Sequence, residues 1–242
     1  MPPPVSAVLV HGAGGGAWEW NVWLGVLRAH GIDPHALELQ PTAAGLAMTT
    51  LEAYASQVRA RLLSLPRPRV IVGASLGGLL AAMCAADADA LILVNTVPCR
   101  PWHSQFPARQ WSGVVHWQRD ARLATTRDGM DDADAASALF AYRRWRDESG
   151  AALGTAWAGV EVDRPTCPVQ FLVSEADDDV PPAVSLAMAG EWGARSVEAL
   201  TASHLGPLLG KAAAPAAEQA VAWLNHALPT APSSDRVGTP PH

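Results

Sequence analysis

A serine between small residues marks the boundary between an apolar run and a helix-forming segment. The stretch VIVGASLGGLL (residues 70–80) contains a Gly-x-Ser-x-Gly pattern, with Ser75 between Gly73 and Gly77. A serine on a tight strand-to-helix turn exposes its hydroxyl, and small neighbours let the strand and the helix approach each other. The pattern therefore predicts that Ser75 is a nucleophile. The helix that follows would direct its positive N-terminal end at a developing oxyanion.

A serine nucleophile needs a base, and the base needs an acid that orients it. Two later β-rich runs end in residues of these types. Asp177, Asp178 and Asp179 follow the run VQFLVS, and His204 follows the run RSVEAL. Acids also favour the first turn of a helix, and a lone histidine is often a surface residue. The chain order serine, aspartate, histidine nevertheless favours a catalytic triad.

A glycine-rich loop follows the first apolar run of the chain. The segment HGAGGGAW (residues 11–18) contains four glycines, which let backbone N–H groups turn inward and form part of an oxyanion hole. A phosphate-binding loop is the alternative. The segment lacks the Gly-Lys-Ser/Thr ending of the Walker pattern and a clean Gly-x-Gly-x-x-Gly. The oxyanion loop is therefore the favoured interpretation.

Strands and helices alternate along the chain and must position these loops. Most of the β-rich runs are continuously apolar, as in strands that are covered on both faces. Strands are expected at residues 5–10, 34–39, 69–73, 90–95, 169–174 and 195–200. Helices are expected at residues 17–29, 50–65, 76–87, 182–192 and 214–227. This alternation predicts an α/β fold, with a mostly parallel, doubly wound sheet of about six strands flanked by helices.

One long interval interrupts the alternation after the fourth expected strand. Residues 98–168 contain no convincing strand but hold five of the ten tryptophans, and residues 131–147 have a helical pattern. An excursion of this length is usually functional. We expect a helical cap or lid at 98–165; a helical subdomain with ordinary core tryptophans is the alternative. The core of the α/β fold would then comprise residues 1–97 and 166–227, with a disordered tail at 228–242.

Composition narrows the class of protein. Of the 242 residues, 49 % are hydrophobic and 17 % charged, which is typical of a globular chain, and the net charge of −6 disfavours a nucleic-acid partner. The three cysteines are widely spaced and show no metal-binding pattern. No targeting segment or membrane span is recognisable, so a cytoplasmic location is expected. We expect no metal, cofactor or membrane partner, and leave a homodimer open.

Together these motifs resemble the α/β-hydrolase superfamily. The opening LVHGAGGGAWEW resembles, more narrowly, the group that contains plant methylesterases and hydroxynitrile lyases. The resemblance covers about residues 5–227. It implies an α/β-hydrolase fold with a Ser-His-Asp triad, in which Ser75 is the nucleophile and His204 the general base and later acid. Related enzymes place the acid four residues before a proline that Pro181 matches here, which selects Asp177.

The resemblance also implies an oxyanion hole and shows one departure. Its donors would be the backbone N–H groups of Ala13 and Leu76. Hydroxynitrile lyases of this group carry a lysine directly after the triad histidine, where this chain has Leu205; its sole lysine, Lys211, lies further along. Cyanohydrin cleavage is therefore not expected.

The expected activity is that of a carboxylesterase acting on small, apolar esters through an acyl-enzyme. Several tryptophans are expected to line its pocket: Trp18, Trp102, Trp111 and Trp117. A thioesterase, lactonase, perhydrolase or carbon–carbon bond hydrolase or lyase would use the same triad. A non-catalytic ligand-binding protein on the same scaffold is a further alternative, against which every catalytic position holds a competent residue.

Overall fold

The computed structural model describes residues 4–106, 109–130, 132–194 and 196–228. A six-stranded sheet, parallel at every strand pair, lies at the centre, in the order β2-β1-β3-β4-β7-β8. Its strands are β1 (Ser6–Val10), β2 (Asp33–Leu37), β3 (Arg69–Ala74), β4 (Ala90–Val94), β7 (Val169–Ser174) and β8 (Ser196–Leu200). The predicted fold class is therefore confirmed.

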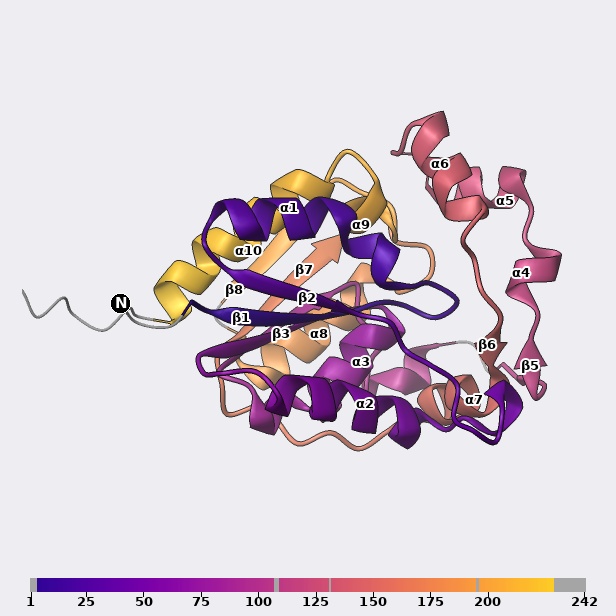
Figure 1. The fold of residues 1–242 in the computed structure, drawn as a ribbon, viewed down its shortest axis with the longest axis horizontal. Coiled ribbons are helices and arrows are strands. Elements are labelled where there is room, and N and C mark those ends of the chain that lie inside the picture. The colour runs from indigo at the N-terminus through magenta and orange to yellow at the C-terminus, as the bar shows by residue number, and fades with distance from the viewer. Residues whose placement is uncertain (1–3, 107–108, 131, 195, 229–242) are drawn as a thin grey trace, which may run out of the picture.

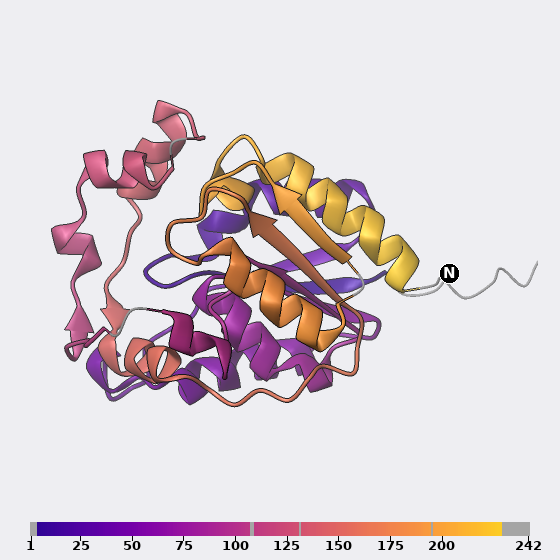
Figure 2. The ribbon, with the colours of Figure 1, turned by 180° about the vertical axis from the view of Figure 1, so that it is seen from behind.

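Helices cover both faces of this sheet, as Figures 1 and 2 show. On one face lie α1 (Asn21–Ala29) and α10 (Ala213–Ala227), and on the other lie α2 (Leu51–Leu63), α3 (Leu76–Met83) and α8 (Pro182–Trp192). Successive residues of β1 alternate between the two apolar cores: Val8 belongs to one core and Leu9 to the other. Burial on both faces explains why the strands are apolar at nearly every position.

The strand order changes direction between β1 and β3. From β1 the chain moves outward to β2, and from β3 it moves to β4 on the other side. Ligands of open α/β sheets bind at the carboxyl ends of the strands at such a switch point. Residues 11–18 follow β1 and Ser75 follows β3, so both predicted catalytic segments begin here.

The segment 98–165, called the insertion below, connects β4 to β7. It contains η4 (Trp102–Gln105), β5 (Val114–Val115), α4 (Trp117–Asp120), α5 (Leu123–Asp128), α6 (Ala135–Tyr142), β6 (Glu148–Ser149) and α7 (Gly150–Ala158). Helices α4, α5 and α6 stand beyond the carboxyl edge of the sheet (Figures 1 and 2). The remaining short elements are η1 (Ala17–Trp20), η2 (Leu46–Met48), η3 (Ala85–Asp87) and α9 (Gly206–Leu209).

Two expectations for the insertion were wrong. It contains a short antiparallel ladder, β5 with β6, where no strand was expected. The helix predicted over 131–147 is only α6, which begins after Asp134, whose carboxylate accepts a hydrogen bond from the Ser137 N–H at 2.7 Å. It ends early because the backbone N–H of Arg146 donates to the Gly14 carbonyl instead of continuing the helix. The described residues end at Leu228, so the rest of the predicted tail lies outside them.

Candidate active site

Ser75 occupies a strained turn between β3 and α3. Its φ of 52° and ψ of −122° are rare for a residue that carries a side chain. The turn is held by backbone bonds, because the Ser75 N–H donates to the Val94 carbonyl and the Ser75 carbonyl accepts from the Val97 N–H, both at 3.0 Å. The strain therefore coincides with the residue that the sequence motif selects.

The two glycines of the motif allow the close contact of strand and helix. A Cβ on Gly73 would collide with the carbonyl of Gly77. A Cβ on Gly77 would collide with the carbonyls of Val10 and His11 at the end of β1. Backbone atoms cannot rotate away as a side chain can, so no larger residue fits at either position.

Asp177 and His204 form a buried hydrogen-bonded pair. His204 Nδ1 lies 2.8 Å from Asp177 Oδ2, and the two side chains are 10 % and 1 % exposed. The other carboxylate oxygen, Oδ1, accepts from the backbone N–H groups of Asp179 and Val180 at 2.9 and 2.8 Å. These bonds fix the carboxylate and distinguish Asp177 from the two aspartates after it.

The surroundings of His204 favour its protonated form. Burial alone lowers its pKa, but the hydrogen bond and charge of Asp177, with the charges of Asp179 and Glu19, outweigh burial and raise the pKa above the usual 6.5. Because Nδ1 is engaged by Asp177, proton exchange with a substrate falls to Nε2. A base of this kind can accept a proton from a neighbouring hydroxyl and then hold the positive charge.

Asn95 positions the histidine loop, and sequence reasoning missed it. It directly follows β4, with a φ of 45°. Its Nδ2 donates to the backbone carbonyl of His204 and to Ser174 Oγ, both at 2.8 Å, while its Oδ1 accepts from the Ser174 N–H. An asparagine at the end of an apolar strand was the available signal, since asparagine tolerates positive φ better than most residues.

The predicted oxyanion donors lie together at the switch point. Ala13 and Leu76 line the same cavity as Ser75 and His204. Within the part of the chain that the structure describes, neither backbone N–H donates a hydrogen bond to the protein. Two unpaired donors at the start of a helix and in a glycine loop match what a tetrahedral oxyanion requires.

Residues from the insertion hold the loop 11–18 from outside. The Gly14 N–H donates to Glu148 Oε2 at 3.0 Å, and the Gly14 carbonyl accepts from the Arg146 N–H at 2.8 Å. The Arg146 guanidinium also donates to the Gly15 carbonyl at 2.7 Å. Glu148 is buried and accepts a further bond from the Tyr54 hydroxyl at 2.8 Å. None of these supports was expected from the sequence, because they join segments far apart in the chain.

His11 is buried and structural rather than reactive. Burial, the largest effect, lowers its pKa to about 4. Its Nε2 accepts from the Leu39 N–H at 3.1 Å, which assigns the proton to Nδ1, 2.8 Å from the Gly12 carbonyl. A neutral His11 therefore joins the oxyanion loop to the segment after β2.

Glu19 is a buried acid beside the same loop and was also missed. It is 1 % exposed, and its Oε2 accepts from the Gly12 N–H at 3.2 Å. Burial, the dominant cause, raises its pKa to about 7. At neutral pH this carboxyl is therefore divided between its acid and its carboxylate forms.

A cavity of about 400 Å³ is lined by Ser75 and His204, and by the predicted oxyanion residues Ala13 and Leu76. Ser75 and His204 line it at the carboxyl edge of the sheet, and the insertion contributes both apolar residues and polar ones, among them Arg109, Asp120 and Arg122. Four tryptophans of the insertion line it: Trp111, Trp117, Trp145 and Trp157. Trp111 contacts Trp117 and Trp157 edge-on, with ring centroids 6.1 and 5.3 Å apart. Such a lining suits an apolar or aromatic ligand.

Two of the predicted pocket tryptophans lie elsewhere, and two others take their place. Trp18 lines a second cavity, and Trp102 packs edge-on against Trp192 under the sheet, with ring centroids 6.4 Å apart. Trp145 and Trp157 line the catalytic cavity instead. The abundance of tryptophan predicts an aromatic site but not which rings face it, because that depends on the path of the insertion.

Neither a metal site nor a membrane span is found among the described residues. No group of three or more histidine, cysteine, aspartate or glutamate side chains there is placed to hold a metal ion. No helix in the described ranges has the length and apolar character that crossing a membrane requires.

The fold resembles those of several solved structures. Polyneuridine aldehyde esterase is 15 % identical, with a TM-score of 0.72 and coverage of 92 % of this chain and 99 % of the other. Tomato methylketone synthase I is 16 % identical, with a TM-score of 0.73 and coverage of 93 % and 99 %. The pyrethroid hydrolase PytH is 22 % identical, with a TM-score of 0.71 and coverage of 91 % and 98 %.

Sequence comparison agrees on the family. No curated protein sequence shows significant similarity to the chain. The model of the alpha/beta hydrolase family matches residues 7–220, which is most of the chain and includes Ser75, Asp177 and His204. The resemblance inferred from the motifs is thus confirmed, and the chain belongs to the alpha/beta hydrolase family.

Proposed function

We propose that the protein is a carboxylesterase that cleaves small, apolar esters at Ser75. The observation that carries the proposal is the strained Ser75 turn in one cavity with a histidine that is hydrogen-bonded to a buried aspartate. Esterases among the structures of similar fold support the same reaction class.

The proposed reaction proceeds through an acyl-enzyme. Ser75 Oγ attacks the ester carbonyl carbon, and His204 Nε2 takes the hydroxyl proton while Asp177 stabilises the resulting imidazolium. The Ala13 and Leu76 N–H groups bind the oxyanion. The C–O bond then breaks, and the alcohol leaves with the proton held by His204. Water, deprotonated by His204, hydrolyses the acyl-enzyme and restores Ser75.

The insertion is proposed to act as a cap over this site. Its tryptophans form the apolar part of the cavity, and Arg146 and Glu148 hold the oxyanion loop. An aromatic cavity of about 400 Å³ favours short acyl or aryl esters. Thioesters, lactones and some carbon–carbon bonds would meet the same groups, so a substrate panel separates these activities.

The test compares the wild type with Ser75→Ala. Hydrolysis of p-nitrophenyl acetate, butyrate and octanoate is measured for both, together with covalent labelling by a fluorophosphonate and circular dichroism as the check on folding. We expect the wild type to turn over and label, and folded Ser75→Ala to do neither. Below the raised pKa of His204, kcat/KM should fall as pH falls, because the protonated imidazole cannot accept the serine proton.

Two other outcomes have clear meanings. Labelling without hydrolysis of any ester would keep the nucleophile and reject this substrate class. A folded wild type that neither labels nor hydrolyses would reject the esterase proposal and favour a ligand-binding protein on this scaffold.

A further inference from the structure

Glu19 lines two cavities rather than one. The first is the catalytic cavity, and the second has a volume of about 300 Å³. The second lies between the start of α1, helix α9 and helix α6 of the insertion. Besides Glu19 it is lined by Trp18, Asn21, Val22, Ala136, Ser137, Phe140, Leu208 and Leu209. Most of these side chains are apolar, so this cavity suits a hydrocarbon group better than a polar one.

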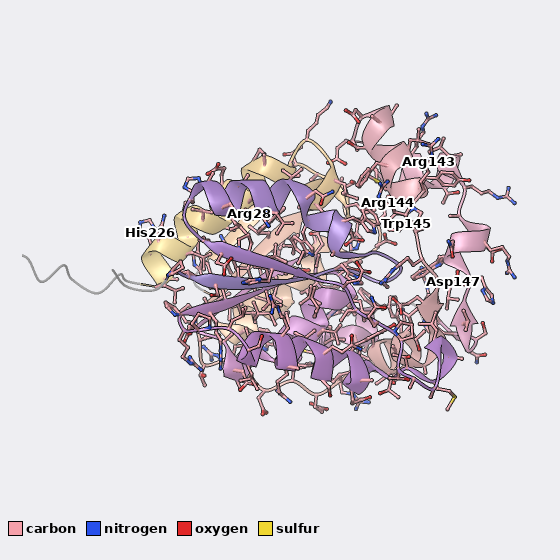
Figure 3. All side chains as sticks on the ribbon, viewed as in Figure 1. Arg28, Arg143, Arg144, Trp145, Asp147 and His226 are labelled. Atoms are coloured by element: carbon pink, nitrogen blue, oxygen red, sulfur yellow. The ribbon has the colours of Figure 1, made fainter. Side chains whose placement is uncertain are left out.

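A pair of tryptophans completes the division between the cavities. Trp145 lines the catalytic cavity and Trp18 lines the second, and their rings meet edge-on with centroids 5.5 Å apart. Trp145 Nε1 donates to Thr126 Oγ1 at 3.0 Å, which fixes that ring. Figure 3 shows Trp145 on the stretch of the insertion that follows α6. The wall therefore consists of Glu19 from the core and of this tryptophan pair.

Glu19 is fixed within that wall. Its Oε2 accepts from the Gly12 N–H, and a Cβ on Gly15 would overlap its carboxyl group, so the glycine loop wraps closely around it. The charged groups that act on it are His204, Arg146 and Glu38. The side chain is buried and bound to the Gly12 N–H, so it keeps one position between the two cavities.

We propose that Glu19 is a specificity-determining residue whose side chain separates the catalytic cavity from the second, apolar cavity and so limits the length of ester that reaches Ser75. This rests on the proposed esterase function. With a smaller residue at this position, the hydrocarbon chain of a longer ester extends past the wall toward Val22 and Phe140. The substrate class that the wild type excludes is thus esters with extended aliphatic groups.

The test measures chain-length selectivity in matched variants. Glu19→Ala removes the side chain, and Glu19→Gln keeps its size and an acceptor for the Gly12 N–H but removes its ionisation. The readout is the ratio of kcat/KM for p-nitrophenyl octanoate to that for p-nitrophenyl acetate. We expect Glu19→Ala to raise this ratio about tenfold or more, because additional methylenes become buried. Glu19→Gln should keep the wild-type ratio.

A second change tests where the added chain goes. Ala136 lines only the second cavity, from helix α6. Adding Ala136→Phe to Glu19→Ala should fill that cavity and return the ratio toward the wild-type value. Glu19→Thr, whose hydroxyl can accept from the Gly12 N–H, is a second opening variant if Glu19→Ala does not fold.

Three results would overturn the inference. The first is an unchanged ratio in folded Glu19→Ala or Glu19→Thr, and the second is an equal rise in Glu19→Gln, which would assign the effect to charge. The third is a gain that survives Ala136→Phe. Failure of the esterase proposal looks different, since the wild type itself would then neither label with the fluorophosphonate nor turn over p-nitrophenyl acetate.

Discussion

The nucleophile turn and the oxyanion loop are built in opposite ways. Around Ser75, the motif itself supplies much of the geometry, because Gly73 lets α3 approach β3 and Gly77 lets α3 approach the end of β1. The loop 11–18 depends on partners far along the chain, such as Glu148, which is 134 residues from the Gly14 that it binds. One half of the site is thus local, and the other half depends on the whole fold.

The acid and the base repeat this contrast. Asp177 is fixed by N–H groups of its own turn, those of Asp179 and Val180. The His204 loop is held from β4 by Asn95, and the neighbouring Ser203 hydroxyl donates to Asp132 of the insertion at 2.5 Å. Local geometry appears in a sequence motif, whereas support from distant residues does not.

The two halves also differ in their response to pH. The contacts that hold the Ser75 turn are backbone bonds and glycines, which do not titrate. The oxyanion loop is bordered by His11 and Glu19, whose pKa values are moved in opposite directions by burial, to about 4 and about 7. Apart from the titration of His204 itself, changes in pH should therefore act on the loop 11–18 rather than on the Ser75 turn.

The largest effect on stability is expected from Gly77→Ala, which disturbs the contact of α3 with the end of β1. The added methyl collides with the carbonyls of Val10 and His11, so we expect a loss of at least about 3 kcal/mol of unfolding free energy or failure to fold. Chemical denaturation measures it. Gly25→Ala is the matched control, because its Cβ meets nothing within 4 Å; it should be neutral or slightly stabilising. Equal stability of both variants would contradict a tightly packed elbow.

Asp177→Asn tests the local acid without disturbing its turn. The Asn oxygen can still accept from Asp179 and Val180, but its amide faces His204 Nδ1 and selects the wrong tautomer. We expect kcat to fall by about 10⁴-fold with the fold retained. Asp178→Asn is the control, because Asp178 is exposed and should leave the rate unchanged. Wild-type turnover by Asp177→Asn would remove Asp177 from the proposed triad.

Glu19→Gln tests, through the free energy of unfolding, whether the buried carboxyl beside the loop 11–18 titrates. The folded-state pKa of Glu19 is raised from 4.5 to about 7, so the folded protein binds the proton more tightly than the unfolded chain does. The wild type should therefore lose stability as pH rises from about 4.5 through 7, by roughly 3 kcal/mol. Glu19→Gln should lack this loss, while the contribution of His11 is common to both proteins.

The measurement is the difference in unfolding free energy between Glu19→Gln and wild type, from pH 4.5 to pH 8. It should move in favour of Glu19→Gln as pH rises. Parallel pH profiles for the two proteins would show that Glu19 does not titrate between these limits.

Glu148→Gln tests the support that the insertion gives to the loop 11–18 through Gly14, and its expected effect is the smallest of the four. Glutamine keeps one acceptor oxygen in place of two, so one of the two backbone N–H groups that bind the carboxylate, that of Gly14 or that of Ser149, loses its bond. We expect kcat to fall about tenfold, with KM nearly unchanged, because the loop holds the developing charge rather than the ground state. Tyr54→Phe removes a bond to the same carboxylate from α2 and should affect kcat less. A larger fall in Tyr54→Phe would contradict a role through Gly14.

The strands and helices could be predicted from the sequence wherever burial determines the spacing of apolar residues. The strand predicted at 169–174 has those bounds in the structure, and the helix predicted at 182–192 is α8. Both are determined by apolar periodicity and local start signals. The predicted Ser75, Asp177 and His204 follow three strands of the sheet and line, or directly support, one cavity; their catalytic roles remain predictions.

The insertion was harder to predict because tertiary contacts override local preference there. The stretch after Tyr142 has a helical pattern, yet Arg146 leaves the helix to bind the oxyanion loop. Trp102 and Trp145 are indistinguishable by residue type, but one packs on Trp192 and the other lines the cavity. Glu19 follows the glycine loop in sequence, and only its burial between two cavities distinguishes it from a surface acid.

The contacts of Arg146 and Glu148 with the loop 11–18 tie the insertion to the proposed oxyanion hole. Residues 98–165 therefore cannot be exchanged as a whole for the corresponding segment of another chain. The tryptophan-bearing part that shapes the cavity can diverge or be grafted from another chain, whereas Asp132 and residues 146–149 must remain with the core. A chimera that exchanges the whole insertion would alter selectivity and lose the oxyanion loop's anchor at the same time. One that keeps residues 146–149 and Asp132 would change selectivity alone.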